Sequence, residues 1–247
     1  MGEIKQLDDT MPAHLSVLLI APGKYGKTTA LSTLPRPLLV GDADGGIGSL
    51  KKKGLIKSEG IFVYDIKSYK DGQDFIDNAW KQGPDGKPFA SVAFDTFSWF
   101  MNNIVKSEIL AMTRREKMER NDWGLYLERG LYIMNHAHKL ARNPDGCHVV
   151  LACHESDKGG SEDEAGKLGP AVSGQLFDIL PGMPDFVAFL KIRATGKFDP
   201  TTKRPIARRV FQLAADLRTP AGARADVPDE MEPDFSKLWE HVMKVAA

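Results

Sequence analysis

The stretch Ala21-Pro22-Gly23-Lys24-Tyr25-Gly26-Lys27-Thr28 decides the fold of this chain of 247 residues. An apolar run over residues 15–20, typical of a buried strand, precedes it, and a helix-compatible segment over residues 28–34 follows it. A glycine-bearing turn between strand and helix that ends in Gly-Lys-Thr is the context of a phosphate-binding loop. The alternative, a glycine-rich turn with a chance lysine, is disfavoured by that flanking strand and helix.

Each residue of the loop has a predicted role. Backbone N–H groups of such a turn face an anion, and glycine lets the backbone come close to it. We expect Lys27 to reach the β- and γ-phosphates and the Thr28 hydroxyl to hold Mg²⁺. The usual first glycine is Ala21 here, and a small residue fits if its φ is not positive. ATP and Mg²⁺ are the expected cofactors, and the other predicted nucleotide-binding residues are Pro22, Gly23, Lys24, Tyr25, Gly26 and Thr29.

Carboxylates follow two further strand candidates. Residues 38–41 lead into Asp42-Ala43-Asp44-Gly45-Gly46, which is either a metal or water-activating site or an Asp/Gly turn. Residues 90–94 lead into Asp95, which suits the second element of a P-loop NTPase, where a carboxylate holds Mg²⁺ directly or through water.

A histidine ends the strand candidate over residues 148–153. A polar side chain in the position of His154, on a strand beside the phosphate loop, can sense the γ-phosphate. A purely structural histidine is an equally good interpretation. The Gly/Ser/acidic stretch over residues 156–167 is predicted to be a mobile loop.

A basic region occurs late in the chain. Residues 186–192 and 210–213 favour two antiparallel strands, and the basic residues along and between them are opposed in that stretch by Asp199 alone. A protruding basic hairpin suits contact with a DNA backbone, whereas lysines that protect an edge strand from aggregation are the alternative. The predicted DNA contacts are Lys197, Lys203, Arg204 and Arg208.

Composition sets limits on function and location. The formal net charge is zero, so contact with nucleic acid must use a local basic surface. The two cysteines have no metal-binding spacing and are expected to be reduced and buried. No apolar run approaches the roughly 20 residues of a membrane span, and no signal peptide is evident, so we expect a soluble, cytoplasmic protein with no membrane partner.

The whole chain is predicted to form one domain, with an N-terminal arm over residues 1–12 and a C-terminal extension over residues 221–247. A third strand candidate covers residues 61–66. Hydrophobic periodicity predicts helices over residues 71–81, 96–112, 123–142 and 234–245. These elements indicate an α/β protein.

The order of these motifs resembles that of the RecA-like phage ATPases of the single-strand annealing (Sak) type. The resemblance spans roughly residues 15–220 and rests on residues 21–29, 41–46, 92–96 and 151–155, on Pro170-Ala171-Val172-Ser173-Gly174-Gln175-Leu176, and on Asp216-Leu217-Arg218.

The resemblance implies a RecA-like P-loop core, a mostly parallel sheet flanked by helices, with ATP hydrolysis linked to single-stranded DNA. Asp44 takes the position of the water-activating carboxylate, where relatives usually carry Glu. His154 would couple nucleotide state to the following loop. Arg218 would act in trans on the ATP of a neighbouring subunit, although Asp216 replaces the lysine of the family's Lys-x-Arg motif. Lys27, Asp44, Asp95 and His154 are then the predicted catalytic residues.

Three functions follow from this pattern. The first is a phage-type ATPase that forms a ring or filament and promotes annealing or strand exchange, with single-stranded DNA and a single-strand DNA-binding protein as candidate partners. If phage-encoded, it would act in the host cytoplasm. The second is a nucleotide-gated binding module with little turnover. The third, a small-molecule kinase, needs an arginine-rich lid, and the stretch over residues 156–167 contains no arginine.

Overall fold

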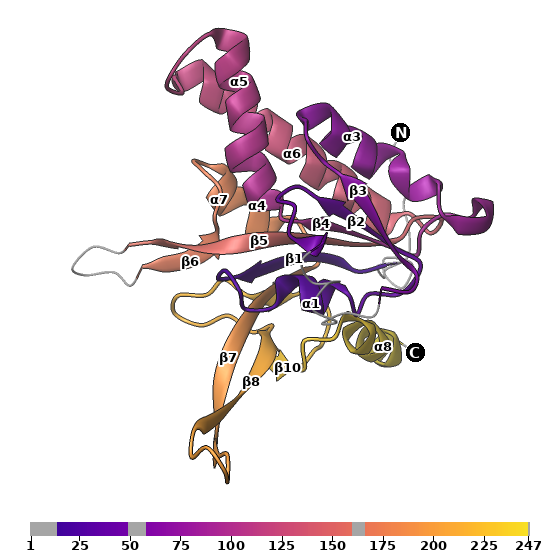
Figure 1. The fold of residues 1–247 in the computed structure, drawn as a ribbon, viewed down its shortest axis with the longest axis vertical. Coiled ribbons are helices and arrows are strands. Elements are labelled where there is room, and N and C mark those ends of the chain that lie inside the picture. The colour runs from indigo at the N-terminus through magenta and orange to yellow at the C-terminus, as the bar shows by residue number, and fades with distance from the viewer. Residues whose placement is uncertain (1–13, 49–57, 160–165, 247) are drawn as a thin grey trace.

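The computed structural model describes residues 14–48, 58–159 and 166–246. The predicted arm over residues 1–12 and the centre of the predicted loop over residues 156–167 lie outside the described residues. A central sheet carries helices on both faces, and a long hairpin extends away from the body (Figure 1).

One ten-stranded sheet runs through the described residues. Its strands are β1 Ser16–Ala21, β2 Leu38–Asp42, β3 Ile61–Asp65, β4 Ser91–Asp95, β5 His148–Lys158, β6 Lys167–Pro170, β7 Phe186–Phe198, β8 Pro205–Gln212, β9 Gly222–Ala223 and β10 Glu230–Met231. The strand order is β10-β8-β7-β1-β5-β4-β2-β3, with β6 on β5 and β9 on β7. The run from β7 to β3 pairs in parallel, and β6, β8, β9 and β10 pair antiparallel. The predicted α/β fold, with a mostly parallel sheet and a C-terminal antiparallel hairpin, is confirmed.

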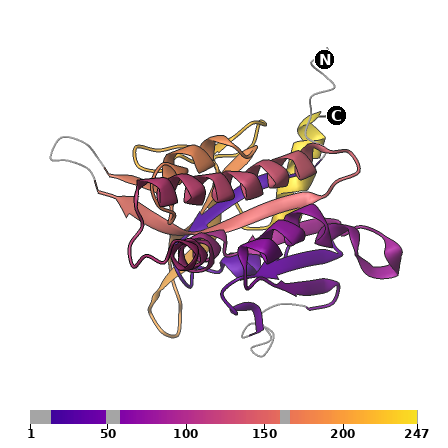
Figure 2. The same cartoon turned by 90° about the horizontal axis from the view of Figure 1, so that it is seen from above.

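Helices cover both faces of this sheet. Their bounds are α1 Lys27–Leu31, α3 Tyr69–Asp77, α4 Phe97–Trp99, α5 Lys106–Thr113, α6 Arg120–Arg142, α7 Leu176–Ile179 and α8 Phe235–Ala246. A π-helical segment, Phe100–Val105, joins α4 to α5, and short 3₁₀ turns are Ala79–Lys81, Pro84–Gly86 and Leu180–Gly182. The cores place α3, α4, α6 and α7 on one face and α1 and α8 on the other. Figure 2 shows the long helix α6 crossing the first face.

The central strand β1 explains this layering. All six of its residues are buried, because the strand lies between β5 and β7 and has helices on both sides. Leu18 and Ile20 point into the core under α6, whereas Val17 and Leu19 point into the core under α1 and α8. A parallel strand buried on both faces therefore reads as a continuous apolar run rather than an alternating one.

The structure extends several predicted elements. β5 continues to Lys158, so the start of the predicted mobile loop is a strand that pairs with β6. The hairpin of β7 and β8 is also longer than predicted. Sequence missed its outer half because these residues are half-buried or exposed and form no apolar run. Residues 214–233, for which the sequence predicts no strand, contribute the short strands β9 and β10 to the sheet.

The terminal helix α8 docks beside the segment after the phosphate loop. Phe235 N donates to Thr33 Oγ1 at 2.8 Å, and Ser236 Oγ donates to the Thr33 carbonyl at 2.6 Å. Phe235 and Leu238 are fully buried. These contacts attach the C-terminal helix to the side of the sheet that carries α1.

Phe100→Ala is expected to lower the free energy of unfolding by about 3–5 kcal/mol, because it deletes a large side chain from the core. Phe100 is fully buried and its ring lies 4.9 Å from that of Phe94, centroid to centroid. Urea unfolding measures the loss, and Trp99→Ala is the matched control because Trp99 is 43% exposed. Equal losses in both variants would contradict this packing.

Candidate nucleotide-binding site

The predicted site residues meet at one edge of the parallel sheet. Ala21 and His154 are Cα partners at the ends of β1 and β5, and Asp42 and Asp95 are partners at the ends of β2 and β4. Ligands of open α/β sheets bind in the crevice outside the carboxyl ends of the strands. The sheet therefore places the phosphate loop beside the carboxylates that were predicted to act with it.

The phosphate loop has the backbone geometry that its sequence indicated. Gly26 has φ 99° and ψ 30°, in the left-handed region that glycine tolerates best. Lys24 has φ 64°, which is uncommon for a residue other than glycine. Ala21 is the last residue of β1 and is not among the residues with positive φ, so alanine fits the first position.

The Lys27 ammonium is held inside the loop. Its side chain is 6% exposed, and Nζ donates to the carbonyls of Ala21 at 3.2 Å and Pro22 at 3.1 Å. Burial lowers the pKa of Lys27, while the charge of Asp95 is the largest influence that raises it. A buried cation satisfied only by neutral carbonyls is ready to accept an anion.

Thr28 and Asp95 form the candidate Mg²⁺ site. Thr28 Oγ1 donates to Asp95 Oδ2 at 2.6 Å. Asp95 is 3% exposed, and burial raises the pKa of its carboxyl to about 6, against the opposing effect of the Thr28 hydrogen bond. Both groups offer oxygen ligands, which suit Mg²⁺, and NTPase sites complete its coordination with substrate phosphates and water.

No cluster of three or more His, Cys, Asp or Glu side chains could hold a metal alone within the described residues. A dedicated protein cage is therefore not built here. The hydroxyl–carboxylate pair fits an ion that arrives with a nucleotide.

The two carboxylates after β2 have different roles. Asp42 is 9% exposed, and its carboxylate accepts the backbone N–H groups of Gly45, Gly46 and Ile47. It therefore fixes the turn. Asp44 is exposed, and its charge raises the pKa values of both Lys27 and Asp95. Asp44 Oδ1 also accepts the Gly46 N–H at 2.9 Å, so both carboxylates contribute to the Asp/Gly turn, and the exposed Asp44 is the candidate to position water.

His154 is hydrogen-bonded to the short helix α4 that follows the Asp95 strand. Its backbone N–H donates to Ser98 Oγ at 2.9 Å, and its Nδ1 lies 3.3 Å from the same oxygen. Burial lowers the pKa of His154, and the charge of Lys27 lowers it further. A neutral imidazole on the strand beside the phosphate loop therefore connects β5 to the first turn of α4.

Some residues of the basic region form ion pairs with acidic side chains that the sequence did not indicate. Lys191 pairs with Glu155 at 2.7 Å, with both side chains largely buried, and Arg193 pairs with Glu230 at 2.6 Å. The interpretation that Asp199 alone opposes these charges is wrong, because their acidic partners come from distant parts of the chain. The predicted DNA contacts, in contrast, are all exposed: Lys197, Lys203, Arg204 and Arg208.

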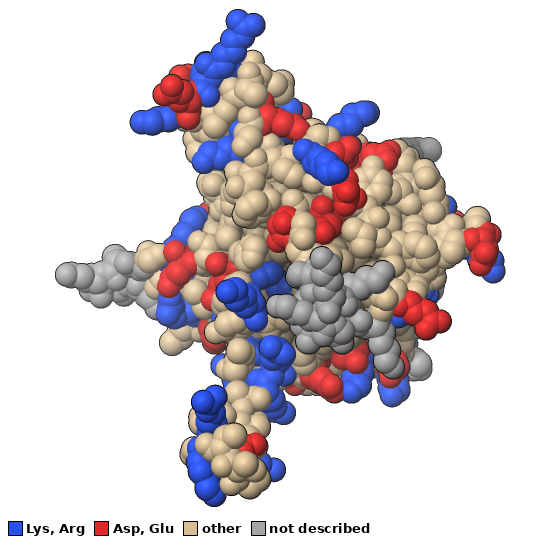
Figure 3. Space-filling view, in the orientation of Figure 1, with Lys and Arg blue, Asp and Glu red and all other residues tan. Residues whose placement is uncertain are grey.

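The tip of the hairpin combines cations with an aromatic ring. Figure 3 shows blue side chains gathered on the protruding hairpin. Phe198, next to Lys197, is 65% exposed. Asp199 orders the turn by accepting from the backbone N–H groups of Thr201 and Thr202.

Arg218 lies away from the phosphate loop. Its guanidinium pairs with Asp157 at 2.5 Å and donates to the Gly166 carbonyl at 3.0 Å. Asp216 fixes the same turn, and the Gln212 hydrogen bond is the main cause that lowers the pKa of Asp216 to about 2. Within the described residues, neither the ion pair nor the hydrogen bonds of Arg218 join it to the predicted catalytic residues, so a trans role stays a prediction.

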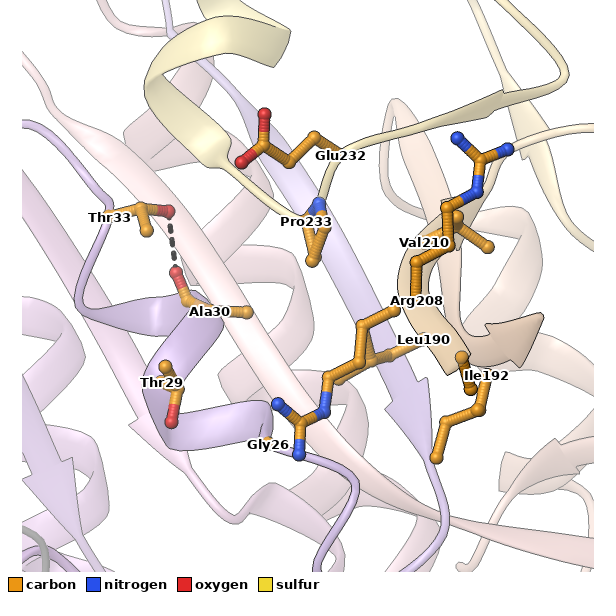
Figure 4. Close-up of a pocket in the computed structure, with 12 residues that line it drawn as sticks. Gly26, Thr29, Ala30, Thr33, Leu190, Ile192, Arg208, Val210, Glu232 and Pro233 are labelled. Carbon is orange, nitrogen blue, oxygen red and sulfur yellow. Dashed lines mark hydrogen bonds between the residues drawn. The ribbon is translucent and has the colours of Figure 1, made fainter. Parts of the chain in front are cut away.

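A cavity adjoins the phosphate loop that sequence reasoning did not locate. It has a volume of about 730 Å³, within the range of small-molecule sites. One wall is Thr29 of α1 with Thr33 of the turn that follows it, and the other is the base of the hairpin with Leu190 and Ile192 (Figure 4). Only the pairing of β7 with β1 brings these walls together, so no local sequence signal could have found it.

A comparison with protein families agrees with this geometry. A family model described as an AAA domain matches residues 13–225. The chain belongs to this family of AAA-domain P-loop ATPases. The match covers the phosphate loop, the Asp95 strand, His154 and the basic hairpin of the AAA domain. A search of curated proteins gives no match.

Two further observations concern the AAA domain as a whole. No helix within the described residues combines the length and apolarity that a membrane crossing requires. Cys147 and Cys153 are both free and buried, as predicted.

Asp95→Asn is expected to stabilise the nucleotide-free protein at pH 7–8. The pKa of this carboxyl rises from 3.8 to about 6 on folding, and a carboxylate with a higher pKa in the folded state opposes folding once ionised. The gain is at most about 3 kcal/mol, since each pH unit between the two values contributes about 1.4 kcal/mol. Urea unfolding measures this difference in stability between Asp95→Asn and wild type. The difference should reach its full value above pH 6 and vanish below pH 4.

Asp216→Asn is the control with the opposite sign. Its pKa is lowered to about 2, so the wild-type carboxylate stabilises the fold above pH 4. This variant should lose stability at pH 7, with a loss that shrinks as the pH falls toward 2. A stability difference for Asp95→Asn that stays constant from pH 4 to 8 would show that burial does not raise its pKa.

Proposed function

We propose that this AAA domain is a Mg²⁺-dependent ATPase of the RecA-like phage type that acts with single-stranded DNA in recombination, by annealing or strand exchange. The observation that carries the ATPase proposal is the Thr28–Asp95 hydrogen bond of 2.6 Å beside the buried Lys27. The DNA proposal rests on the exposed basic hairpin and on the resemblance in motif order.

ATP would bind with its phosphates on the loop over residues 21–29 and its nucleoside in the adjoining cavity. Lys27 would exchange its carbonyl partners for phosphate oxygens, which stabilise the ammonium better than neutral acceptors do. Thr28 and Asp95 would hold Mg²⁺, which supplies neutralisation of phosphate charge during transfer.

Hydrolysis would use the exposed carboxylate of Asp44 to position water. Aspartate is one methylene shorter than the glutamate usual at this position, which favours slow turnover. His154, neutral and bonded to Ser98, would report the presence of the γ-phosphate to β5. The same features support the second candidate, a nucleotide-gated module that binds ATP and hydrolyses little of it.

Assembly is the remaining part of the proposal. In a ring or filament, Arg218 would approach the ATP of a neighbouring subunit. It would first have to leave Asp157, with which it pairs in the isolated chain. Both side chains are about half exposed, so this ion pair is weak enough to exchange for a phosphate. A single-strand DNA-binding protein is a further candidate partner.

Lys27→Ala is expected to abolish ATP hydrolysis, both alone and with single-stranded DNA, because it removes the charge that contacts the transferred phosphate. Phosphate release with and without DNA measures this, and Lys139→Ala, an exposed lysine on α6, is the control. DNA stimulation lost only in Lys27→Ala supports the recombination ATPase. Binding without turnover supports the nucleotide-gated module, and absence of ATP binding overturns both.

The hairpin is tested separately from the ATPase. Replacing three tip cations, as Lys197→Gln, Lys203→Asn and Arg204→Gln together, is expected to weaken binding of single-stranded DNA. Asparagine suits position 203 because its φ is 56°. In the plot of log affinity against log salt, the slope should become shallower by about 2, at roughly 0.7 for each lost phosphate contact.

A matched triple variant removes cations from elsewhere on the surface: Lys67→Gln, Lys87→Gln and Lys139→Gln. Fluorescence anisotropy of a labelled oligonucleotide across a salt series compares the two proteins. If both variants change the slope equally, the hairpin is not the DNA-binding surface.

A further inference from the structure

One arginine of the hairpin differs from the others in the face it occupies. In the pairing of β7 with β8, Arg209 lies opposite Ile192. Side chains alternate between the two faces of a strand, so Arg209 lies on the same face as Phe211. Phe211 packs on Phe235 of α8, with the ring centroids 4.8 Å apart. Arg209 therefore faces the side of the sheet that carries α1, whereas Arg208 faces the opposite side with Lys191 and Arg193.

The side chain of Arg209 lies against the phosphate loop. A Cβ built on Gly26 would come within 3.3 Å of Arg209 Nε and 3.5 Å of its Cζ. Both residues line the 730 Å³ cavity. The base of the hairpin thus contributes a cation to the same loop that holds Lys27.

The guanidinium of Arg209 has no hydrogen bond or ion pair in the part of the chain that the structure describes. Nearby basic residues on the opposite face are satisfied: Lys191 by Glu155 and Arg193 by Glu230. The acidic residue that lines the same cavity, Glu232, pairs with Lys237. Two cations, Lys27 and Arg209, therefore flank one loop, and no carboxylate among the described residues is directly bonded to either.

We propose that Arg209 binds the phosphate groups of the nucleotide in cis, so that β8 forms the second wall of the nucleotide site. This inference rests on the proposed function, because it requires a nucleoside triphosphate on the loop. A guanidinium can donate two parallel hydrogen bonds to a phosphate, which a lysine cannot reproduce. Because Arg209 and the basic tip belong to one hairpin, nucleotide binding also fixes the base of the element proposed to contact DNA.

The test is a titration of full-length protein with fluorescent ATP, using wild type, Arg209→Ala, Arg209→Lys and the control Lys139→Ala. Loss of a charge-assisted hydrogen bond is expected to weaken ATP binding by about tenfold or more in Arg209→Ala. Arg209→Lys should fall between wild type and Arg209→Ala, and Lys139→Ala should match wild type. Thermal unfolding without nucleotide checks that each variant is folded.

Amide hydrogen exchange separates phosphate contact from a merely structural role. At saturating ATP, exchange over residues 205–212 should slow in wild type but not in Arg209→Ala, whereas the nucleotide-free proteins should exchange alike. If wild type binds ATP and Arg209→Ala shows the same ATP affinity and the same slowing of amide exchange over residues 205–212, the inference about Arg209 is overturned while the proposed function stands. Absence of ATP binding in wild type overturns the proposed function, and this inference with it.

Discussion

The burial of the Lys27 ammonium at the end of β1 is the constraint on which the site depends. Placing an unpaired charge in the interior is costly unless polar groups surround it. Here the loop carbonyls provide two acceptors, and Asp95 contributes a charge that is itself disfavoured by burial. Each group is stabilised in part by the charge of the other, and the proposed phosphate and Mg²⁺ would stabilise both further. The burial of these two charges therefore favours the binding of an anion and a cation at the loop.

The parallel sheet is what brings these groups together. Strand β5 separates the phosphate-loop strand β1 from the Asp95 strand β4, so Thr28 must cross the end of β5 to reach Asp95. His154 occupies that strand end, and Ser98 ties it to α4. The imidazole of His154 therefore lies on the strand between the phosphate loop and Asp95. A movement of the loop or of Asp95 would act on a neighbouring strand end.

Local sequence was enough for the core of the fold and for the loop. Apolar runs marked β1, β4 and β5 because strands buried on both faces carry no alternation to obscure them, and Gly26-Lys27-Thr28 stood in the right context. Sequence could not separate Asp42 from Asp44, since only the fold shows that Asp42 is buried in the turn while Asp44 is exposed. It also could not show that Glu155 neutralises Lys191 or that Arg209 reaches Gly26, because those contacts join residues far apart in the chain.

Strand β5 joins the nucleotide site to the ion pair that holds Arg218. It passes His154 at the nucleotide site and reaches Asp157, the partner of Arg218, without an intervening turn. Three residues of extended chain cover about 10 Å, and antiparallel pairing with β6 stiffens this segment. His154 and Asp157 therefore lie on one continuous paired strand, with no flexible turn between them. If the chain assembles as proposed, a displacement of His154 would be transmitted along β5 to Asp157, the residue that holds Arg218.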